Sequence, residues 1–497
     1  MDPLVGTLRA NFGWNAFKPG QRQIIEAILS GRDALAVLPT GGGKSLCYQL
    51  PAIIKEGLVV VISPLIALME DQVINLRERG IWAECLHTSL DPLRKKKVNQ
   101  LIQENKLRLL YLSPERLQGE SIRRLLETLF EENKLVCIAV DEAHCISAWG
   151  HDFRPEYRRL GKIRSMCPRV PVVALSATAA PRVRADIIKL LYLSKPFVHV
   201  DSARRRNLEY TMYRRPKNPL PDILRALNTA RGASLIYVRT RRSVEHWTEV
   251  LNDKGIPAIA YHAGLPPEIR QAAQKSFASQ NAPVLVATVA FGMGVDRKDV
   301  GLVLHLNLPS SPEGYLQESG RAGRDGLPAK CMVLFSPRDR ISLVWAMRSS
   351  SLKYSKEFLS IEDKLRFEFA YKQLRRMEAI AEGGECREKM LLESVGEVVD
   401  PCGTCDRCRD YKQIRDCSKQ AIAILHKLDS SKNIGMANLS ENFDFDENNK
   451  TVSSGWIVRR LVEEEFIAES NDGAQNLSLK ESGRQFLRKP WPLKYIA

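Results

Sequence analysis

Short apolar runs alternate with stretches of helical periodicity over most of the chain. Such runs are typical of strands buried on both faces, and their alternation with helices indicates βα units and a parallel sheet. One set of runs predicts a first sheet: residues 35–38, 59–62, 109–112, 135–140 and 172–175. A later set predicts a second sheet: residues 234–238, 258–260, 284–287 and 300–306.

Two changes in this pattern divide the 497 residues. Arginine- and proline-rich sequence interrupts the periodicity at residues 201–221, which predicts a linker. From about residue 349 the strand pattern stops and long amphipathic helical patterns follow. We therefore predict two α/β domains, a helical domain and a small C-terminal domain, at residues 1–205, 206–345, 346–412 and 413–497.

A glycine loop follows the first predicted strand and precedes a predicted helix. Its members are Thr40, Gly41, Gly42, Gly43, Lys44 and Ser45. Glycines let backbone N–H groups approach a polyphosphate, and the helix N-terminus favours the anion. The lysine of such a loop reaches the β and γ phosphates, and the serine hydroxyl binds Mg²⁺. Leu38 stands at the first glycine position of the full pattern, so the loop alone is an imperfect match.

Two carboxylates end the apolar run at residues 135–140, namely Asp141 and Glu142 of the sequence Asp-Glu-Ala-His. A metal ligand and a water-orienting base are needed at the carboxyl end of a strand in phosphoryl transfer. We predict that Asp141 binds Mg²⁺ together with Ser45, and that Glu142 orients the attacking water. The two motifs together predict a nucleoside triphosphate site.

Two arginines, Arg321 and Arg324, lie in a glycine-rich segment at the end of the second α/β domain. An arginine that reaches a γ phosphate across a cleft neutralises charge in the transition state, which is worth ~10³ or more in rate. We predict that both complete the site; the alternative is a basic turn at a sheet edge.

Composition favours a polyanionic partner. The chain has 74 Lys+Arg against 58 Asp+Glu, a formal charge of +16, and beside a nucleotide site this excess favours nucleic acid over a membrane or an acidic protein. The N-terminus has no signal-peptide pattern, and Ser63 and Pro64 break the longest apolar stretch. We therefore expect no membrane association.

Four of the eleven cysteines cluster: Cys386, Cys402, Cys405 and Cys408. Two consecutive gaps of two residues let loop thiolates converge on Zn²⁺, and four protein ligands indicate a structural site. The alternatives are four unrelated thiols or disulfides, and nothing in the sequence indicates export. The seven other cysteines stand singly in mostly apolar surroundings and predict buried thiols.

With these motifs the chain resembles the RecQ family of superfamily 2 DNA helicases, from about residue 12 to residue 408. The resemblance implies two tandem RecA-like lobes, a helical zinc-binding subdomain with residues 365–382 as its platform, and a winged-helix-like domain. It implies a short form without the further C-terminal helical domain of many relatives. It also implies that Gln21 hydrogen-bonds adenine while Lys18 and Trp14 sandwich the ring; Lys18 stands where arginine is usual.

The segment after the Asp-Glu-Ala-His motif resembles the family's aromatic-rich loop, which senses single-stranded DNA. By this resemblance the residues that couple DNA to the nucleotide site are Trp149, His151, Asp152, Phe153 and Arg154. Aromatic faces suit unstacked bases, with ~1 to 3 kcal/mol per base. The alternative is an aromatic core cluster, and Ala148 stands where glutamine or glutamate is usual.

Further segments resemble family motifs that contact DNA or join it to the nucleotide. Val289 stands where asparagine is common, and His262 and His305 are either functional or structural. The predicted contacts are Ser63 and Pro64 in a backbone-gripping motif, Ser176 and Thr178 at the end of a first-lobe strand, and Gly294 and Asp296 in the second lobe.

Beyond residue 417 the pattern predicts helices at residues 420–426 and 454–466 and a wing strand at residues 476–479. This order is similar to the family's winged-helix domain. Residues 456–464 form either a helix that lies on duplex DNA or a packing helix.

The resemblance implies an ATP-dependent DNA helicase of DNA repair and recombination that moves 3′ to 5′ on single strands, with ATP, Mg²⁺ and Zn²⁺ as cofactors. It implies single-stranded and duplex DNA as partners, a single-strand DNA-binding protein as a candidate partner, and a cytoplasmic monomer associated with the nucleoid. The alternatives are an RNA helicase or non-unwinding translocase, and a DNA-binding or strand-annealing scaffold with an inactive motor.

Overall fold

The computed structural model describes the whole chain except residues 1, 88–89, 91, 151–152, 280–282, 289–296, 353–360, 410–413, 431–433, 436–438, 440–453, 471–475 and 497. It forms two compact units. One comprises Met1–Glu209, Pro216–Met332 and Leu391–Val399, and the other comprises Tyr210–Arg215, Val333–Met390 and Asp400–Ala497.

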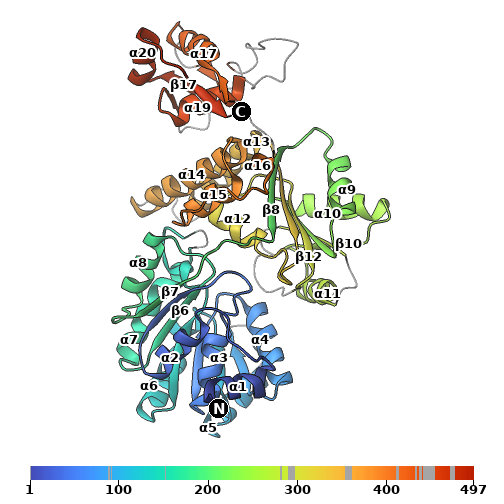
Figure 1. The fold of residues 1–497 in the computed structure, drawn as a ribbon. Coiled ribbons are helices and arrows are strands. Elements are labelled where there is room, and N and C mark those ends of the chain that lie inside the picture. Colours follow the sequence, from blue (N-terminus) through green and yellow to red (C-terminus); the bar gives the residue numbers. More distant parts are fainter. Residues whose placement is uncertain are drawn as a thin grey trace. The chain divides into compact units, whose positions relative to one another are not determined.

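A seven-stranded sheet forms the first lobe, with the order β3-β4-β2-β5-β6-β1-β7 and every pairing parallel. Figure 1 shows this lobe in blue to green. Its strands are β1 (Ala34–Val37), β2 (Leu58–Ile62), β3 (Ala83–Leu86), β4 (Leu109–Leu112), β5 (Leu135–Val140), β6 (Val172–Ser176) and β7 (Phe197–Val200). Its helices are α1 (Pro3–Phe12), α2 (Gln21–Leu29), α3 (Leu46–Ile54), α4 (Ile66–Glu78), α5 (Pro92–Gln103), α6 (Glu120–Glu131), α7 (Ile163–Met166) and α8 (Pro181–Leu190), with 3-10 turns η1 (Arg116–Gln118), η2 (Ala143–Ile146) and η3 (Pro155–Lys162).

Alternate residues of these strands enter two separate cores. In β2, Val60 and Ile62 pack in one core with side chains of α6 and α8, whereas Val59 and Val61 pack in the other with side chains of α2 and α3. Successive side chains of a strand point to opposite faces, so helices on both faces require apolar residues at every position. This requirement explains the continuous apolar runs.

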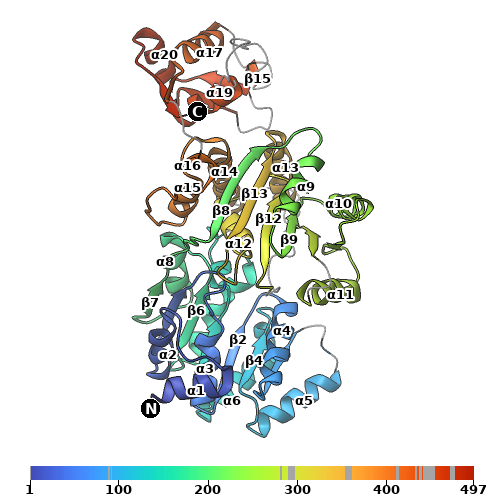
Figure 2. The ribbon, with the colours of Figure 1, turned by 45° about the vertical axis from the view of Figure 1, so that its right-hand side comes forward.

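A six-stranded sheet forms the second lobe, with the order β10-β11-β9-β12-β13-β8. Figure 2 shows β8 beside β13. The strands are β8 (Leu208–Arg214), β9 (Ala233–Tyr237), β10 (Ala258–Tyr261), β11 (Val284–Ala287), β12 (Val300–His305) and β13 (Ala329–Phe335), and the helices are α9 (Leu220–Asn228), α10 (Arg241–Asp253), α11 (Pro267–Ala278) and α12 (Pro312–Ser319).

The prediction of a linker at residues 201–221 is wrong for residues 208–214. β8 lies there and forms the edge of the second sheet next to β13. Its apolar residues Leu208, Tyr210 and Met212 stand at alternate positions and are buried, and Thr211 between the last two is buried as well. The neighbouring arginines and prolines hid this short period-2 signal. Three further strands of the two lobes, β3, β7 and β13, were also not predicted.

The helical region consists of α13 (Arg338–Leu352), α14 (Ile361–Glu382), α15 (Arg387–Ser394) and α16 (Asp406–Arg409). The predicted boundary at residue 205 lies in the loop between β7 and β8, whereas residue 346 lies inside α13. We therefore propose that the helical domain begins in the loop before α13. The boundary at residue 412 lies outside the described residues.

The C-terminal domain, the described residues from 414 to 496, has its own apolar core. Leu425, Val458, Leu477 and Phe486 from four of its elements are fully buried there. Its elements are α17 (Ser418–Ser430), α19 (Ser454–Glu463) and α20 (Glu481–Arg488), the antiparallel strands β15 (Ile434–Gly435), β17 (Asn476–Leu479) and β16 (Ile467–Glu469), and the antiparallel pair β14 (Ile414–Asp416) and β18 (Lys494–Ile496). The strand predicted at residues 476–479 is β17.

Candidate active site and zinc centre

The glycine loop lies between β1 and α3, as the sequence predicts. Gly41 and Gly43 have φ angles of 82° and 76°, a region that side chains with a Cβ rarely adopt. A Cβ at Gly43 would lie 2.3 Å from Nε2 of Gln21, so a larger residue would displace the end of that side chain. Backbone N–H groups of such a loop can converge on an anion, although that of Gly42 donates to the Pro39 carbonyl oxygen at 2.8 Å.

Lys44 and Glu142 face each other across the carboxyl ends of β1 and β5. Nζ of Lys44 lies 3.5 Å from Oε1 of Glu142, and both side chains are mostly buried. Glu142 adopts φ 47° and ψ 46°, a left-handed conformation that is uncommon outside glycine and turns the chain sharply after β5. The structure therefore places the predicted phosphate-binding lysine next to the predicted base.

Asp141 lies at the end of β5 and is buried. Burial, and to a smaller extent the charge of Glu142, raise the pKa of its carboxyl to about 6, although Lys44 partly opposes this shift. Oδ1 accepts a hydrogen bond from the Glu142 amide at 3.0 Å, and the hydroxyl of Tyr157 donates to the Asp141 carbonyl oxygen at 3.0 Å. A buried carboxylate beside the Ser45 loop is the hard oxygen ligand that Mg²⁺ prefers, so these residues fit the ion.

Gln21 and Lys18 hold the glycine loop directly. Nε2 of Gln21 donates to the carbonyl oxygens of Gly42 and Gly43 at 3.2 and 3.0 Å, and Nζ of Lys18 donates to that of Gly41 at 2.6 Å. Trp14 is exposed and stacks on Phe12 at a centroid distance of 5.7 Å. The glycine loop is therefore in direct contact with two of the residues that we predict to bind adenine.

Arg324 lies beside the glycine loop. A Cβ at Gly41 would lie 3.9 Å from Cγ of Arg324, and one at Gly320 would lie 3.3 Å from Oγ1 of Thr40. Arg321 is buried, and both arginines act on Tyr237, whose pKa burial raises to about 12 although the charges of Arg321 and Arg324 oppose the shift. Of the two, Arg324 is the one with a contact to the glycine loop.

Arg205 holds the arginine-bearing segment in place, which the sequence did not indicate. Its guanidinium donates to the carbonyl oxygens of Gly320, Ala322 and Gly323 at 3.2, 3.1 and 2.6 Å. Asn207 also donates to Gly323, at 2.9 Å. Three adjacent arginines at residues 204–206 were the available signal, and we interpreted them as part of a linker.

The aromatic-rich loop packs on the Asp-Glu-Ala-His motif. A Cβ at Gly150 would lie 2.5 Å from the carbonyl oxygen of His144. His144 in turn lies 3.4 Å from Oε2 of Glu142, and its Nδ1 is 2.9 Å from Oγ of Ser176, which donates to the Thr178 carbonyl oxygen. A chain of contacts therefore joins this loop to the predicted base.

Trp149 is half-buried against the first-lobe core, and the Arg182 guanidinium lies 3.6 Å from its ring centroid. Phe153 has Arg158 at 5.3 Å from its centroid. Arg154 donates to the carbonyl oxygen of Pro64 at 3.0 Å, which joins this loop to the predicted DNA-gripping segment. The predicted residues His151, Asp152, Gly294 and Asp296 lie outside the described residues, as does Val289.

The remaining predicted DNA residues of the first lobe are buried. Ser63 follows β2, Ser176 ends β6, and Thr178 accepts a hydrogen bond from Nε2 of Gln317 at 3.3 Å. His262 and His305 are buried beside Glu245 and Glu318, at 3.3 and 2.8 Å. These contacts favour a structural role for both histidines.

Four thiols converge in the helical region. The Sγ atoms of Cys386, Cys402, Cys405 and Cys408 all lie within 4.8 Å of one another. The Cys386–Cys402, Cys402–Cys408 and Cys386–Cys405 separations are 3.5, 3.9 and 4.0 Å. Tetrahedral Zn²⁺ with bonds of about 2.3 Å requires sulfur atoms about 3.8 Å apart, so the cluster fits zinc.

A buried ion pair braces the thiol cluster. Arg387 and Asp406 directly follow Cys386 and Cys405, and Nη2 of Arg387 lies 3.0 Å from Oδ2 of Asp406. Arg387 also donates to the carbonyl oxygen of Gly383 at 3.0 Å. The seven other cysteines are all buried and lie apart from this cluster, as predicted.

Three family profiles match the chain in succession: DEAD/DEAH box helicase at residues 18–187, Helicase conserved C-terminal domain at residues 217–326, and RecQ zinc-binding at residues 338–409. The ATP-dependent DNA helicase RecQ of Bacillus subtilis (strain 168) is 32% identical over 500 residues, which cover 96% of this chain and 82% of that protein. The chain belongs to the RecQ family. This membership confirms the resemblance, and the zinc-binding profile begins at the first residue of α13.

Other RecQ proteins are more similar in sequence over a shorter span. ATP-dependent DNA helicase RecQ of Pasteurella multocida (strain Pm70) is 41% identical over 405 residues, 81% of this chain and 62% of that protein. The corresponding protein of Haemophilus influenzae is 41% identical over 411 residues, 82% of this chain and 63% of that protein. The chain therefore spans less than two thirds of the length of these two relatives.

Solved structures share the fold. Mycobacterium smegmatis helicase Lhr bound to ssDNA and AMP-PNP aligns with a TM-score of 0.55 at 17% identity, over 98% of this chain and 61% of that one. Helicase MrfA bound to DNA aligns with a TM-score of 0.56 at 17% identity, over 97% and 63%. The predicted fold class, two RecA-like lobes followed by a helical zinc-binding subdomain and a small winged-helix-like domain, is confirmed; the last domain contains a small antiparallel sheet. In the described part of the chain, no helix is both long and apolar enough to cross a membrane.

Proposed function

We propose that the protein is an ATP-dependent DNA helicase. The observation that carries the proposal is the convergence of Lys44, Glu142 and Arg324 on one glycine loop: Lys44 lies 3.5 Å from Glu142, and Cγ of Arg324 lies 3.9 Å from a Cβ placed on Gly41. A phosphate-binding cation, a base and a second cation are the groups that phosphoryl transfer to water requires. The RecQ relatives are named ATP-dependent DNA helicases.

Each residue has a distinct role in this proposal. Lys44 and the loop amides bind the β and γ phosphates, and Ser45 and Asp141 hold Mg²⁺, which when bound neutralises phosphate charge. Glu142 orients the attacking water and takes its proton. Arg324 stabilises the charge that develops on the transferred group, while Arg321 is a positioning residue buried in the second lobe.

DNA would reach this site through the aromatic-rich loop. Trp149 and Phe153 offer π faces, and Arg154 joins the loop to Pro64. We further propose translocation 3′ to 5′ on single strands, a role in repair and recombination, a monomer, and a single-strand DNA-binding protein as partner in the cytoplasm at the nucleoid. Family membership supports these statements.

The decisive experiment is unwinding of duplexes with a 3′ or a 5′ single-stranded tail. We expect ATP-dependent strand separation of the 3′-tailed substrate only. Stimulation of ATP hydrolysis by RNA but not by DNA would indicate an RNA helicase instead, and stimulation by DNA without strand separation would indicate a non-unwinding translocase. DNA binding or annealing without ATP hydrolysis would indicate a scaffold, although Lys44, Glu142 and Arg324 are all present.

Trp149→Ala tests the coupling of DNA to hydrolysis. The loop contacts His144, which lies 3.4 Å from Glu142. A nucleobase stacked on Trp149 can therefore shift Glu142, the predicted proton acceptor. We expect unstimulated hydrolysis to persist, most of the stimulation by single-stranded DNA to disappear, and DNA binding to weaken modestly, since stacking contributes ~1 to 3 kcal/mol per base. Steady-state hydrolysis with and without single-stranded DNA measures these effects.

Trp82→Ala is the matched control, because Trp82 is a half-exposed tryptophan of the same lobe. It should leave stimulation unchanged. If Trp149 were only a core residue, its truncation would lower stability by ~3 to 5 kcal/mol and reduce every activity together. A melting curve distinguishes the two cases, and preserved stimulation in Trp149→Ala would contradict the coupling role.

A further inference from the structure

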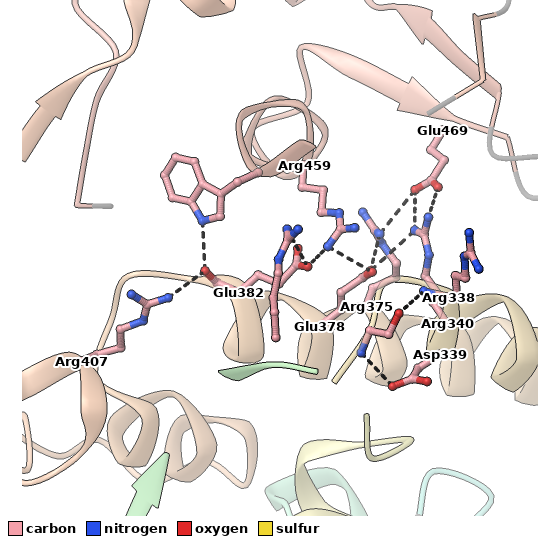
Figure 3. A network of polar contacts seen from close by, with 12 residues as sticks. Arg338, Asp339, Arg340, Arg375, Glu378, Glu382, Arg407, Arg459 and Glu469 are labelled. Carbon is pink, nitrogen blue, oxygen red and sulfur yellow. Dashed lines mark hydrogen bonds and ion pairs between the residues drawn. The ribbon is translucent and has the colours of Figure 1, made fainter. Parts of the chain in front are cut away.

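The C-terminal domain contacts the end of helix α14 through helix α19 (Figure 3). Nε1 of Trp456 donates to the carbonyl oxygen of Glu382 at 3.0 Å. Arg459 forms an ion pair with the Glu382 carboxylate, and its Nη1 lies 3.7 Å from Oε1 of Glu378. The sequence left open whether this helix lies on duplex DNA or packs within the protein. The face that carries Trp456 and Arg459 packs within the protein.

A second contact lies at strand β16, where the C-terminal domain supplies the anion and the helical region supplies the cations. Glu469 accepts hydrogen bonds from both terminal nitrogens of Arg340, of which Nη1 lies at 2.8 Å. Nη1 of Arg375 lies 3.4 Å from Oε2 of Glu469. Arg375 also lies 2.6 Å from Glu378, which joins the two contacts. Figure 3 shows these side chains as one continuous network.

These charges are removed from water. The side chains of Arg340, Glu378, Glu469 and Arg459 are only 4, 5, 6 and 10% exposed. Burial lowers the pKa of Arg459 to about 10, so it still carries its charge at neutral pH. Removing one partner of such a pair leaves the other charge buried and unpaired, which is strongly unfavourable.

The charge pattern selects one orientation of the two surfaces. The C-terminal domain supplies one cation, Arg459, and one anion, Glu469, while the helical region supplies carboxylates opposite the first and guanidinium groups opposite the second. A shifted or rotated arrangement would bring like charges together and cost several kcal/mol by general experience with interfaces. The network thus specifies register as well as contact.

Glu382 is also the meeting point of two other parts of the second unit. Arg407, which lies between Cys405 and Cys408, donates to the same carbonyl oxygen as Trp456, at 3.5 Å. Arg214, the last residue of β8, lies 3.6 Å from the Glu382 carboxylate. Donors and cations at the C-terminal end of a helix satisfy its unpaired carbonyl groups and its dipole.

We infer that Glu378 and Glu382 form a receptor that holds the C-terminal domain in one orientation on the zinc-bearing helical region, and that Arg459 and Glu469 are positioning residues for duplex DNA bound by that domain. The second clause rests on the proposed helicase function; the first does not. Because Arg407 and Trp456 share one acceptor, the thiol cluster and the C-terminal domain are positioned by the same helix end.

Hydrogen exchange of the full-length protein tests the receptor. Arg459→Gln and Glu469→Gln each remove a charge and leave a polar side chain, and we expect exchange at residues 376–385 and 454–463 to rise by roughly tenfold or more. Arg459→Lys keeps the charge and should retain part of the protection. Glu481→Gln removes an exposed carboxylate of α20 in the same domain and should change nothing.

Exchange at residues 421–428 of α17 separates release from unfolding, because that helix lies in the domain's own core. Protection there should persist in every variant. Unchanged exchange at residues 376–385 and 454–463 in both Gln variants overturns the inference. So does loss of protection throughout the C-terminal domain, because the network would then maintain the domain's fold and not its placement.

Strand separation per ATP hydrolysed tests the positioning role. With 3′-tailed duplexes this ratio should fall roughly ten- to a hundredfold in Arg459→Gln, while hydrolysis stimulated by single-stranded DNA stays within about twofold, since misplacement by 1 Å can cost this much. Arg459→Lys should recover part of the ratio. A normal ratio in Arg459→Gln with raised exchange would overturn the positioning role, and a wild-type protein that unwinds nothing would overturn the helicase function while the exchange result stands.

Discussion

Replacing Glu142 by Gln should reduce DNA-stimulated ATP hydrolysis by about 10² to 10⁴-fold, the range expected when a general base is lost. The amide keeps the size of the side chain and can still lie near Lys44, 3.5 Å away in the wild type, but it cannot accept a proton from water. DNA affinity should stay within a few-fold, because other segments bind the strand. Steady-state hydrolysis and equilibrium binding of single-stranded DNA measure the two effects.

Glu132→Gln is the control for this variant. Glu132 lies directly after α6 and pairs with Lys134 on the surface, so its charge should not affect hydrolysis. A wild-type rate in Glu142→Gln would remove Glu142 from the proposed site. A parallel loss of DNA binding and of thermal stability would show that the substitution had disturbed the left-handed turn after β5 and not only the chemistry.

Replacing Cys405 by Ser should remove the structural zinc. The wild-type protein should contain one Zn²⁺ per chain, held by four thiolates whose sulfur atoms lie within 4.8 Å of one another. Structural zinc contributes about 10 to 16 kcal/mol in small zinc-binding peptides, so losing one ligand should unfold this region locally. Elemental analysis measures the metal content, and a melting curve measures the stability.

Hydrolysis of ATP without DNA should change much less in Cys405→Ser than stability and DNA binding, because the thiols lie outside both motor lobes. Cys167→Ala is the control: Cys167 is a buried thiol of the first-lobe core and no member of the cluster. It should keep the full zinc content. A zinc-free wild-type protein that is fully stable would refute the proposed centre.

The sequence by itself determined most of the proposed nucleotide site. The glycine loop and the two carboxylates each follow a buried strand, and the carboxyl ends of parallel strands share one edge of the sheet. Lys44 and Glu142 therefore had to meet, although 97 residues separate them in the sequence. The thiol cluster was equally local, because three of its ligands lie within seven consecutive residues.

Most strands with both faces covered were predictable, because burial on both sides favours apolar residues at every position. β3 is an exception, since all four of its residues are buried but Glu84 interrupts its apolar run. β8 lies at a sheet edge, and its flanking arginines suggested a linker. The same arginines include Arg205, whose three carbonyl acceptors come from residues 115 to 118 positions away. A local sequence pattern cannot indicate a hydrogen-bond partner that lies so far away along the chain.

Only the tertiary structure decided how two equivalent candidates are placed. It puts Arg324 beside Gly41 and buries Arg321, although both lie in one short motif and both charges act on Tyr237. It also turns Trp456 and Arg459 toward α14, where an amphipathic pattern shows only that a helix has two faces. Periodicity and spacing determine element type and local ligand sets, whereas the partner of a long polar side chain depends on segments brought together by folding.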